Sequence, residues 1–503
     1  MIDEYATLNP NGLALDDLTR QRTWAELADR STRIARFLRE QAGLGAHSHA
    51  ALLMENRVEF IELTLGAMLA GVWITPINWH LSPEEIAHIV EDSGARLLFS
   101  DARFEEIARR SGVSDVILAG EELDGVLAEA SDRAMDPAGP AGGSMIYTSG
   151  ATGRPKGVKR ARAPTLDAMV ATVRKAATSF GLDGKGSHLV TGPLYHAAPL
   201  LFAVYDQVNG ASMVMMPSWD EARALELIQE REITHTHLVP TMFVRLLRLP
   251  QEVRESFDAP RLELVLHGAA PVSVSIKKRM IEWWGETIVE YWGGTEAGMN
   301  TMVDSADWLA HPGTVGKALP AFEVFAVDDD GRRLPAGEIG DLYCRHKHMT
   351  AVFEYHNDPA RTAEAYLEPG VFTLGDIGRV DDDGYVYLAD RKSNMIISGG
   401  VNIYPAEIEQ VLQEHPAVAD VGVFGIPDDE WGESIKAAVE LVEGWEPSPE
   451  LGAEILDFGR ERLARYNVPR SVDFEDALPR YENGKLYIKR LRDRYWKDRA
   501  GKI

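Results

Sequence analysis

The chain has 503 residues, which is too long for one ordinary hydrophobic core, so we expect two or three domains. Hydrophobic residues make up 45% of it and charged residues 26%, as in a globular protein. The 52 Lys and Arg residues against 78 Asp and Glu residues give a net charge of −26, which argues against nucleic acid or an anionic membrane as a partner.

The first third of the chain alternates between strands and helices. Residues 50–54 and 72–76 are short apolar runs typical of buried strands, and Asn56 is placed to cap the helix between them. Pro83 is expected to open another helix, and residues 96–100 to form the next strand. This pattern predicts a mostly parallel sheet covered by helices.

A second set of α/β units follows a loop at residues 137–143 and a short strand at residues 144–147. The expected helices cover residues 166–180 and 220–231, and the expected strands cover residues 187–191, 234–239 and 262–266. The last two strands end in turn residues, at Pro240-Thr241 and Gly268–Pro271. Ligands of open α/β sheets bind at such carboxyl ends.

Beyond about residue 350 the pattern changes to short strands and turns, such as the turn at Asp381–Gly384. A small α+β unit begins near Ser393, with a helix from Pro405 and a strand at residues 418–424. The last 19 residues, from Lys485, hold eight Lys or Arg against two Asp, which predicts a solvated amphipathic helix.

The sequence also bears on the cellular compartment. Cys344 is the only cysteine, which excludes an intramolecular disulfide and a multi-cysteine zinc site and fits a reducing environment. The first residues do not have the pattern of a secretory signal, and no apolar run approaches the roughly 18 residues of a transmembrane helix. We therefore expect a cytoplasmic protein without integral membrane association.

The stretch from Thr148 to Gly157, Thr-Ser-Gly-Ala-Thr-Gly-Arg-Pro-Lys-Gly, has the composition of a phosphate-binding loop. Its glycines allow backbone N–H groups to approach an anion, and its hydroxyl and ammonium groups add donors. The residues expected to hold phosphate are Thr148, Ser149, Gly150, Thr152, Gly153 and Lys156. It is not a Walker loop, because Pro155 and Gly157 stand where glycine and Ser or Thr are expected.

Three further motifs suit a nucleotide, although each alone is also consistent with an ordinary turn. Trp292-Gly-Gly-Thr-Glu296 supplies an aromatic ring for a purine, a hydroxyl for a phosphate and a carboxylate for Mg²⁺. Asp376 lies in a turn where a carboxylate can hold both hydroxyls of a ribose. Lys485 lies on a tight turn near the C-terminal end.

In this order, the motifs resemble those of the adenylate-forming superfamily, which includes acyl-CoA synthetases, peptide-synthetase adenylation domains and luciferases. The resemblance covers essentially the whole chain. The segments that carry it are Thr148–Gly157, Trp292–Glu296, Thr373–Asp376, Asp390-Arg391, Ser398–Glu407 and Pro479–Lys485.

The resemblance implies ATP, Mg²⁺ and CoA as cofactors and gives each motif a role. The phosphate loop would hold the β- and γ-phosphates of ATP. The other nucleotide contacts implied are Gly268, Ala269 and Ala270 along the adenine, Trp292 on its face, Thr295 at the α-phosphate, Glu296 on Mg²⁺, and Asp376 and Arg391 at the ribose.

Two half-reactions are implied at one site. Lys485 would reach the carboxylate and the α-phosphate and offset the charge that develops there. The small domain would then rotate and present the loop of Ser398, Gly399 and Gly400 to the pantetheine arm, whose thiol displaces AMP. His196 resembles the family residue between acyl pocket and thiol tunnel, where it would orient or gate; the alternative is a structural histidine at a strand end.

The expected fold class is α/β. It comprises a large N-terminal domain of doubly wound sheets with a small β-rich subdomain at residues 1–391, a hinge at 392–394, and a small mobile α+β domain at 395–503. Two residues depart from the family pattern: Ala151 removes a hydroxyl from the phosphate loop, and Ser393 stands where the hinge is commonly Asp or Lys. A lost hydrogen bond to a charged group is worth roughly 1.5–3 kcal/mol, enough to weaken ATP use.

The expected substrate is a carboxylic acid. No Asp stands where it would grip an amino acid's ammonium group, and the sequence ends soon after Lys485, so we expect a stand-alone acyl-CoA ligase without a carrier domain, not a peptide-synthetase module. The runs at 293–298 and 311–316 look like those of bacterial synthetases for fatty or bulky alicyclic and polycyclic acids, including steroid and bile acid side chains.

Two alternatives stay open beside the full ligase. One is an enzyme that is efficient only in converting a supplied acyl-adenylate to the thioester, as Ala151 suggests. The other is a catalytically silent acyl- or nucleotide-binding protein of the same fold, against which the intact Glu296, Asp376, Arg391 and Lys485 argue. A homodimer is also open, because the sequence does not determine the oligomeric state.

Overall fold

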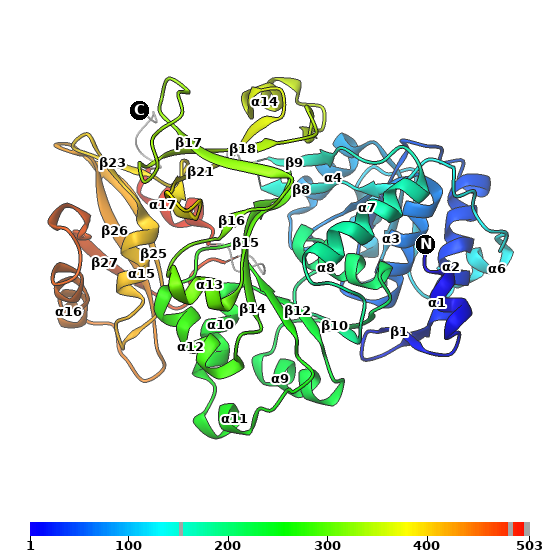
Figure 1. The fold of residues 1–503 in the computed structure, drawn as a ribbon, viewed down its shortest axis with the longest axis horizontal. Helices are drawn as coiled ribbons and strands as arrows, with labels where there is room; N and C mark the ends of the chain where they lie inside the picture. The colour runs from blue at the N-terminus through cyan, green and yellow to red at the C-terminus, as the bar shows by residue number, and fades with distance from the viewer. Residues whose placement is uncertain (150–153, 481–485, 497–503) are drawn as a thin grey trace.

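The computed structural model describes residues 1–149, 154–480 and 486–496. Two α/β sheets are followed along the chain by a β-rich part and then by a smaller α+β unit, as the colours from blue to red show in Figure 1. The predicted fold class is therefore confirmed.

The first sheet has five parallel strands in the order β6-β5-β3-β4-β7. They are β3 (His49–Leu53), β4 (Trp73–Pro76), β5 (Ala95–Ser100), β6 (Asp115–Leu118) and β7 (Gly143–Ser144). Its connecting helices are α3 (Val58–Ala70), α4 (Pro83–Ser93), α5 (Glu105–Arg110) and α6 (Glu121–Glu129). Helix α4 begins as predicted, with Pro83 in its first turn and a capping box between Ser82 and Glu85.

The second sheet has nine strands in the order β16-β15-β14-β13-β12-β10-β11-β1-β2. The strands from β14 to β1 are parallel, whereas β2, β15 and β16 are antiparallel to their neighbours. The strands are β1 (Leu13–Asp16), β2 (Gln21–Thr23), β10 (Ser187–Val190), β11 (Ser212–Met215), β12 (His235–Leu238), β13 (Leu264–His267), β14 (Ile288–Gly294), β15 (Gly298–Val303) and β16 (Lys317–Ala318).

The helices of this part are α1 (Asp3–Leu8), α2 (Trp24–Arg36), α7 (Leu166–Ser179), α8 (Ala197–Val208), α9 (Glu221–Glu230), α10 (Pro240–Arg248), α11 (Gln251–Ser256), α12 (Val274–Trp284) and α13 (Ser305–Ala310). Helices α7 and α9 and strands β10, β12 and β13 confirm the predicted units within a few residues. Pro240 was expected in a turn but begins α10 directly, because proline suits the first helical position.

Asn56 does not cap α3, so that prediction is wrong. The residue before the helix is Arg57, which makes no side-chain cap. The Asn56 amide instead donates to the carbonyls of Gly192 and Met216, at 3.0 and 2.9 Å, and its oxygen accepts from the N–H of Leu194 at 2.8 Å. Asn56 therefore joins the first sheet to the loops that follow β10 and β11.

The β-rich part contains two sheets. Its strands β8 (Ile146–Ser149) and β9 (Pro155–Arg160) come earlier in the chain, and its other strands begin at residue 322, before the predicted change at about residue 350. One sheet is β19-β9-β8, with β19 (Phe353–Tyr355). The other contains β17 (Phe322–Val327), β18 (Gly340–His346), β20 (Tyr366–Glu368), β21 (Val371–Val380) and β22 (Val386–Arg391), with α14 (Pro359–Glu364) beside β20 in the chain.

Within its described residues, the C-terminal unit has a five-stranded sheet, three α-helices and a short 3-10 helix, η3 (Arg465–Asn467). Its strands are β23 (Ile396–Ser398), β24 (Val401–Ile403), β25 (Val418–Asp428), β26 (Gly432–Leu441) and β27 (Ser471–Glu475), and its helices are α15 (Pro405–Leu412), α16 (Pro449–Arg460) and α17 (Ile488–Trp496). The predicted helix at Pro405 and the predicted basic terminal helix are both present. Helices α15 and α17 both pack against β25.

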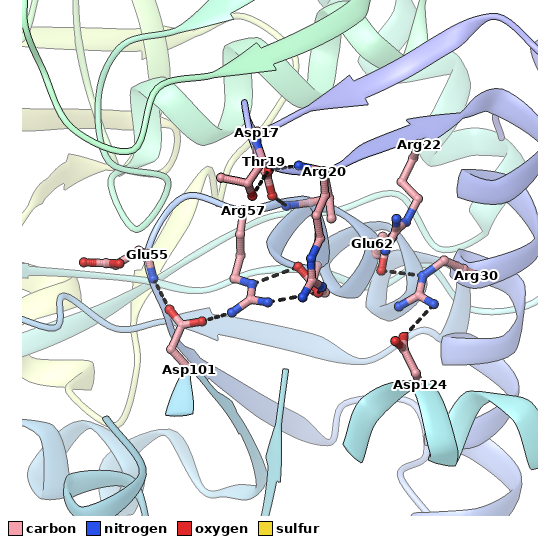
Figure 2. A network of polar contacts seen from close by, with 12 residues as sticks. Asp17, Thr19, Arg20, Arg22, Arg30, Glu55, Arg57, Glu62, Asp101 and Asp124 are labelled. Carbon is pink, nitrogen blue, oxygen red and sulfur yellow. Dashed lines mark hydrogen bonds and ion pairs between the residues drawn. The ribbon is translucent and has the colours of Figure 1, made fainter. Parts of the chain in front are cut away.

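A network of charged side chains fastens the N-terminal elements to α3 (Figure 2). Glu62 is fully buried and lies 2.7 Å from Arg22 Nε and 2.8 Å from Arg30 Nε. Arg57 pairs with buried Glu59 at 2.8 Å and with Asp101. Since buried carboxylates require partners, Arg22 on β2 and Arg30 on α2 fix how these two elements sit on α3. Arg57 ties the start of α3 to Asp101 after β5.

Candidate active site

The predicted phosphate loop joins the hairpin strands β8 and β9. Thr148 pairs with Lys156 across this hairpin, so both flanks of the loop are held in register. The Lys156 ammonium lies 3.7 Å from an Asp358 carboxylate oxygen. The strand predicted at residues 144–147 is divided between β7 and β8, because the chain passes from the first sheet into the hairpin. Gly150, Thr152 and Gly153 lie outside the described residues, as does the side chain of Ser149.

Three residues predicted to contact the nucleoside, Trp292, Asp376 and Arg391, lie close together. Trp292 is buried near the end of β14 and donates its indole N–H to Asp376 Oδ2 at 2.8 Å. Asp376 and Arg391 are paired across β21 and β22, and Arg391 Nε lies 3.4 Å from Asp376 Oδ1. Segments more than eighty residues apart in sequence thus converge on one carboxylate.

The turn after Trp292 also contacts the β-rich part. The Arg160 guanidinium, at the end of β9, donates to the Thr295 carbonyl at 2.8 Å. The Tyr355 hydroxyl donates to Glu296 Oε1 at 3.0 Å, and the Glu296 interaction helps to raise the pKa of Tyr355, although burial is the larger cause. Sequence reasoning missed Arg160 and Tyr355. The position of Arg160, four residues after Lys156 on the same strand, was the available signal for the first.

The predicted adenine loop follows β13. Ala269 is exposed and has a φ of +69°, an uncommon conformation for a residue other than glycine. Gly268 packs against the Tyr291 ring, where a Cβ would come within 2.8 Å of Cζ. Ala270 is partly buried beside them. The loop therefore lies next to the strand that ends in the Trp292 turn.

A buried ion pair lies behind these loops. Lys277 on α12 and Glu290 on β14 are 2.5 Å apart, and the Lys277 ammonium also lies 4.5 Å from the Trp308 ring centroid. Burial lowers the pKa of Lys277 and raises the pKa of Glu290, while their mutual attraction opposes both shifts. Sequence reasoning missed this pair, since nothing in the sequence marks either residue as buried.

His196 directly precedes α8 and does not cap it with its side chain. Its Nε2 is buried and has no hydrogen-bond partner among the described residues. Burial, and secondly the nearby His80, lower the pKa of His196 to about 4, so the imidazole is neutral near pH 7. A buried nitrogen without a partner suits a residue that meets a ligand better than one that serves packing alone.

The C-terminal unit carries the remaining predicted residues. Ser398 ends β23, and Gly399 and Gly400 form the turn to β24 with positive φ values of +60° and +80°. The Gly399 N–H donates to the Trp431 carbonyl at 2.8 Å. Lys485 lies outside the described residues. At the predicted hinge, the Lys392 ammonium lies 2.6 Å from Asp341.

Comparison with known proteins bears on these arrangements. The family model described as AMP-binding enzyme matches residues 2–353, and the model of its C-terminal domain matches residues 407–485. The chain belongs to the AMP-binding enzyme family. This places it in the acyl-CoA synthetase branch of the adenylate-forming superfamily, and the prediction of an acid:CoA ligase is confirmed.

Three similar proteins illustrate the range of the family. The fatty acid–[acyl-carrier-protein] ligase ScoC of Streptomyces coeruleorubidus is 32% identical over 96% of this chain and 93% of its own length. The long-chain-fatty-acid–CoA ligase FadD13 of Mycobacterium tuberculosis is 32% identical over 98% of both chains. The o-succinylbenzoate CoA synthetase MenE of Bacillus subtilis, solved with its acyl-adenylate, is 28% identical with a TM-score of 0.82 and covers 100% of this chain and 99% of its own.

ATP, a carboxylic acid and CoA are substrates that fit this family. Within the described parts of the chain, no helix is both long and apolar enough to cross a membrane. The individual site residues and the domain boundaries at 391 and 395 stay predictions.

Proposed function

We propose that this enzyme joins a fatty or bulky alicyclic or polycyclic carboxylic acid to CoA through an acyl-adenylate. In the first half-reaction a carboxylate oxygen attacks the α-phosphorus of ATP, and pyrophosphate leaves. In the second, the CoA sulfur attacks the acyl carbon, and AMP leaves. The observation that carries the proposal is the convergence of Trp292, Asp376 and Arg391 beside the Thr295 turn.

The nucleotide would lie between that cluster and the hairpin of the phosphate loop. Asp376 and Arg391 would hold the ribose, and Thr148 and Lys156 the outer phosphates. The Arg160 contact to the Thr295 carbonyl supports this, because it sets the α-phosphate turn against the same strand that carries Lys156. Each group is held on a sheet, which favours a preorganised site.

Glu296 is the proposed Mg²⁺ ligand. Mg²⁺ commonly takes one or two carboxylates together with substrate phosphates and waters, so a single carboxylate beside the phosphate turn fits this ion. Tyr355 donates a hydrogen bond to Glu296 Oε1, whereas Oε2 accepts none from the described residues. When bound, the ion would neutralise charge on the ATP phosphates.

His196 and Lys485 are the proposed reaction-centre side chains. A neutral His196 can accept a hydrogen bond from the thiol or donate one to the acid, in agreement with an orienting role. Lys485 would stabilise the charge that develops between carboxylate and α-phosphate during the first half-reaction. The turn at 398–400 would be presented to the pantetheine arm in the second.

Two relatives support the fatty-acid part of the proposed class, and a third shows that the family also includes an enzyme named for a ring-bearing acid. ScoC and FadD13 are named for fatty acids, and MenE is named for an acid that carries an aromatic ring. These relatives resemble the present chain over nearly its whole length, so the acid pocket is the part expected to differ among them.

The test is a pair of assays on one preparation. The first measures acid-dependent release of pyrophosphate from ATP, and the second measures thioester formation from synthetic acyl-adenylates and CoA. The natural enzyme should catalyse both pyrophosphate release and thioester formation with the same acid. Lys485→Ala should lose most of the first activity and keep the second, while Lys489→Ala, an exposed lysine on α17, should keep both.

The outcomes separate the alternatives. Activity with acyl-adenylate alone would point to the half-reaction specialist, and Ala151→Thr should then restore the first step. No activity in either assay with any acid would reject the proposed function. A Lys485→Ala protein that releases pyrophosphate normally would reject the role of this lysine.

A further inference from the structure

A hydrogen bond joins helix α10 to strand β25 of the C-terminal unit. The guanidinium of Arg248, the last residue of α10, donates to the carbonyl of Ala419. The ladder between β25 and β26 shifts register between Val418 and Asp420, so Ala419 is a bulge residue without a partner in the ladder. Its carbonyl accepts a second bond from the Gln413 side chain at 2.8 Å. The bulge thus presents an acceptor that both parts of the chain use.

The charges on the two sides of this contact are complementary. Desolvation lowers the pKa of Arg248, and the carboxylates of Asp420 on β25 and Glu440 on β26 oppose that shift. Within the C-terminal unit, Arg480 pairs with Asp420 through hydrogen bonds of 2.5 and 2.7 Å. Two carboxylates therefore share two arginines, of which one comes from α10.

Strand β25 also holds the segment that follows Arg480. Arg480 and Leu486, which flank residues 481–485, form an isolated antiparallel bridge. Leu486 packs on Gly422 of β25, where a Cβ would come within 2.4 Å of Leu486 Cδ2. Arg248 therefore binds the same strand that supports both flanks of this segment.

The turn at 398–400 has different surroundings. Gly399 and Gly400 are exposed, and the apolar side chains of Ile397 and Val401 beside them are 51% and 44% exposed. Trp431, which packs against Gly399, is 42% exposed. In the described orientation the turn therefore faces solvent, whereas the strand beside Arg480 is bound to α10.

We propose that Arg248 is a positioning residue that holds the C-terminal unit in the orientation for the first half-reaction. This inference rests on the proposed function, in which Lys485 serves the first half-reaction and the turn at 398–400 serves the second. A rotation that exchanges them must break the bond from Arg248 to Ala419, because the two residues lie on opposite sides of the hinge. The partition between the half-reactions should therefore depend on this arginine.

The first experiment measures the ratio of acid-dependent pyrophosphate release to thioester formation from a synthetic acyl-adenylate. Arg248→Ala should lower this ratio about three- to tenfold, because it removes one charge-assisted hydrogen bond at a partly exposed contact. Arg248→Lys keeps a cation and a donor, so its ratio should lie between those of the natural enzyme and the alanine variant. The matched control is Arg245→Ala, which removes an exposed arginine one turn earlier on α10 and should leave the ratio unchanged.

A second measurement reports the orientation without catalysis. Cys344 is the only cysteine and is buried, so a donor and an acceptor dye can be attached at Glu252→Cys on α11 and Glu443→Cys after β26, both at exposed positions. Energy transfer between the dyes then gives the distribution of their distances. Arg248→Ala should increase the share of molecules outside the natural distance range, whereas Arg245→Ala should not.

The outcomes separate this inference from the proposed function. An unchanged ratio, an equal loss of both half-reactions, or an unchanged distribution of dye distances in Arg248→Ala would overturn the inference and leave the proposed function standing. A natural enzyme that catalyses neither half-reaction with any acid would reject the proposed function, and with it the role of Arg248.

Discussion

The buried ion pair between Lys277 and Glu290 allows a quantitative test of how the nucleotide loops are supported. Lys277 is 0% exposed and Glu290 5% exposed. Lys277→Met keeps most of the side-chain volume and leaves the Glu290 carboxylate buried without its partner. Breaking such a pair from one side costs about 3–5 kcal/mol, and loss of the contact with Trp308 adds about 1 kcal/mol.

The assay is urea unfolding of the single and double variants at a constant pH. Replacing both charges by apolar groups is often close to neutral, so Lys277→Met with Glu290→Leu should lie within about 2 kcal/mol of the natural protein. Lys278→Met, at the exposed neighbouring position, is the control and should change stability by less than about 0.5 kcal/mol. If the double variant lost as much free energy of unfolding as the two single variants together, the coupling between Lys277 and Glu290 would be refuted.

The loss of stability in Lys277→Met should also depend on pH, and the direction of that dependence can be predicted. The pKa of Glu290 is raised by burial, so its folded-state proton contributes stability at low pH that is lost as pH rises through the folded pKa. The defect should therefore be larger at pH 8 than at pH 5. A defect that grows as pH falls would contradict the assignment of the buried charge to Glu290.

Three further outcomes are expected. Asp376→Ala should raise the KM for ATP at least about tenfold, because it removes the acceptor of two nearby groups, whereas Asp382→Ala in an exposed turn should not. The free energy of unfolding should fall as pH drops from the ordinary histidine pKa toward 4, and His196→Gln should reduce that slope, because the buried imidazole resists the proton that the unfolded chain accepts. Glu62→Leu should destabilise the protein by about 3–5 kcal/mol, since it leaves two arginines without a buried carboxylate, and Arg110→Gln in an exposed pair should cost less than about 1 kcal/mol; equal effects in urea unfolding would contradict the importance of burial.

Local signals were sufficient for much of the fold. Three strands of the first sheet, β3, β4 and β5, could be predicted because they are short apolar runs, and α4 because Ser82-Pro83 carries its own cap; edge strand β6 is only partly buried and was missed. Asn56 shows where local reasoning failed. Its position before a helix suggests a cap, but its hydrogen bonds go to residues 192, 194 and 216, which only the folded chain brings near.

For the candidate site, too, some residues could be predicted from the sequence and others could not. The motifs and their order could be recognised in the sequence, and Trp292, Asp376 and Arg391 do meet. The contacts that support them depend on strand order and register across sheets, as for Arg160 with Thr295 or His237 with Tyr291. Strand order and register cannot be determined from a single sequence, so these partners could be identified only in the structure.

Two contacts lie at the predicted hinge at 392–394: one stays within the β-rich part, and the other joins it to the C-terminal unit. Only the second restrains a rotation of the C-terminal unit. Lys392 is bound to Asp341 in the β-rich part, on the near side of the hinge. Asp390 is buried at the end of β22, and its carboxylate accepts from the Ala406 N–H at the start of α15, at 2.8 Å, beyond the hinge. A rotation about residue 393 can leave the first contact intact but must break or pivot about the second. Since a hydrogen bond to a charged group is worth about 1.5–3 kcal/mol, Asp390 holds the two units in the observed orientation unless the rotated one supplies an equivalent donor.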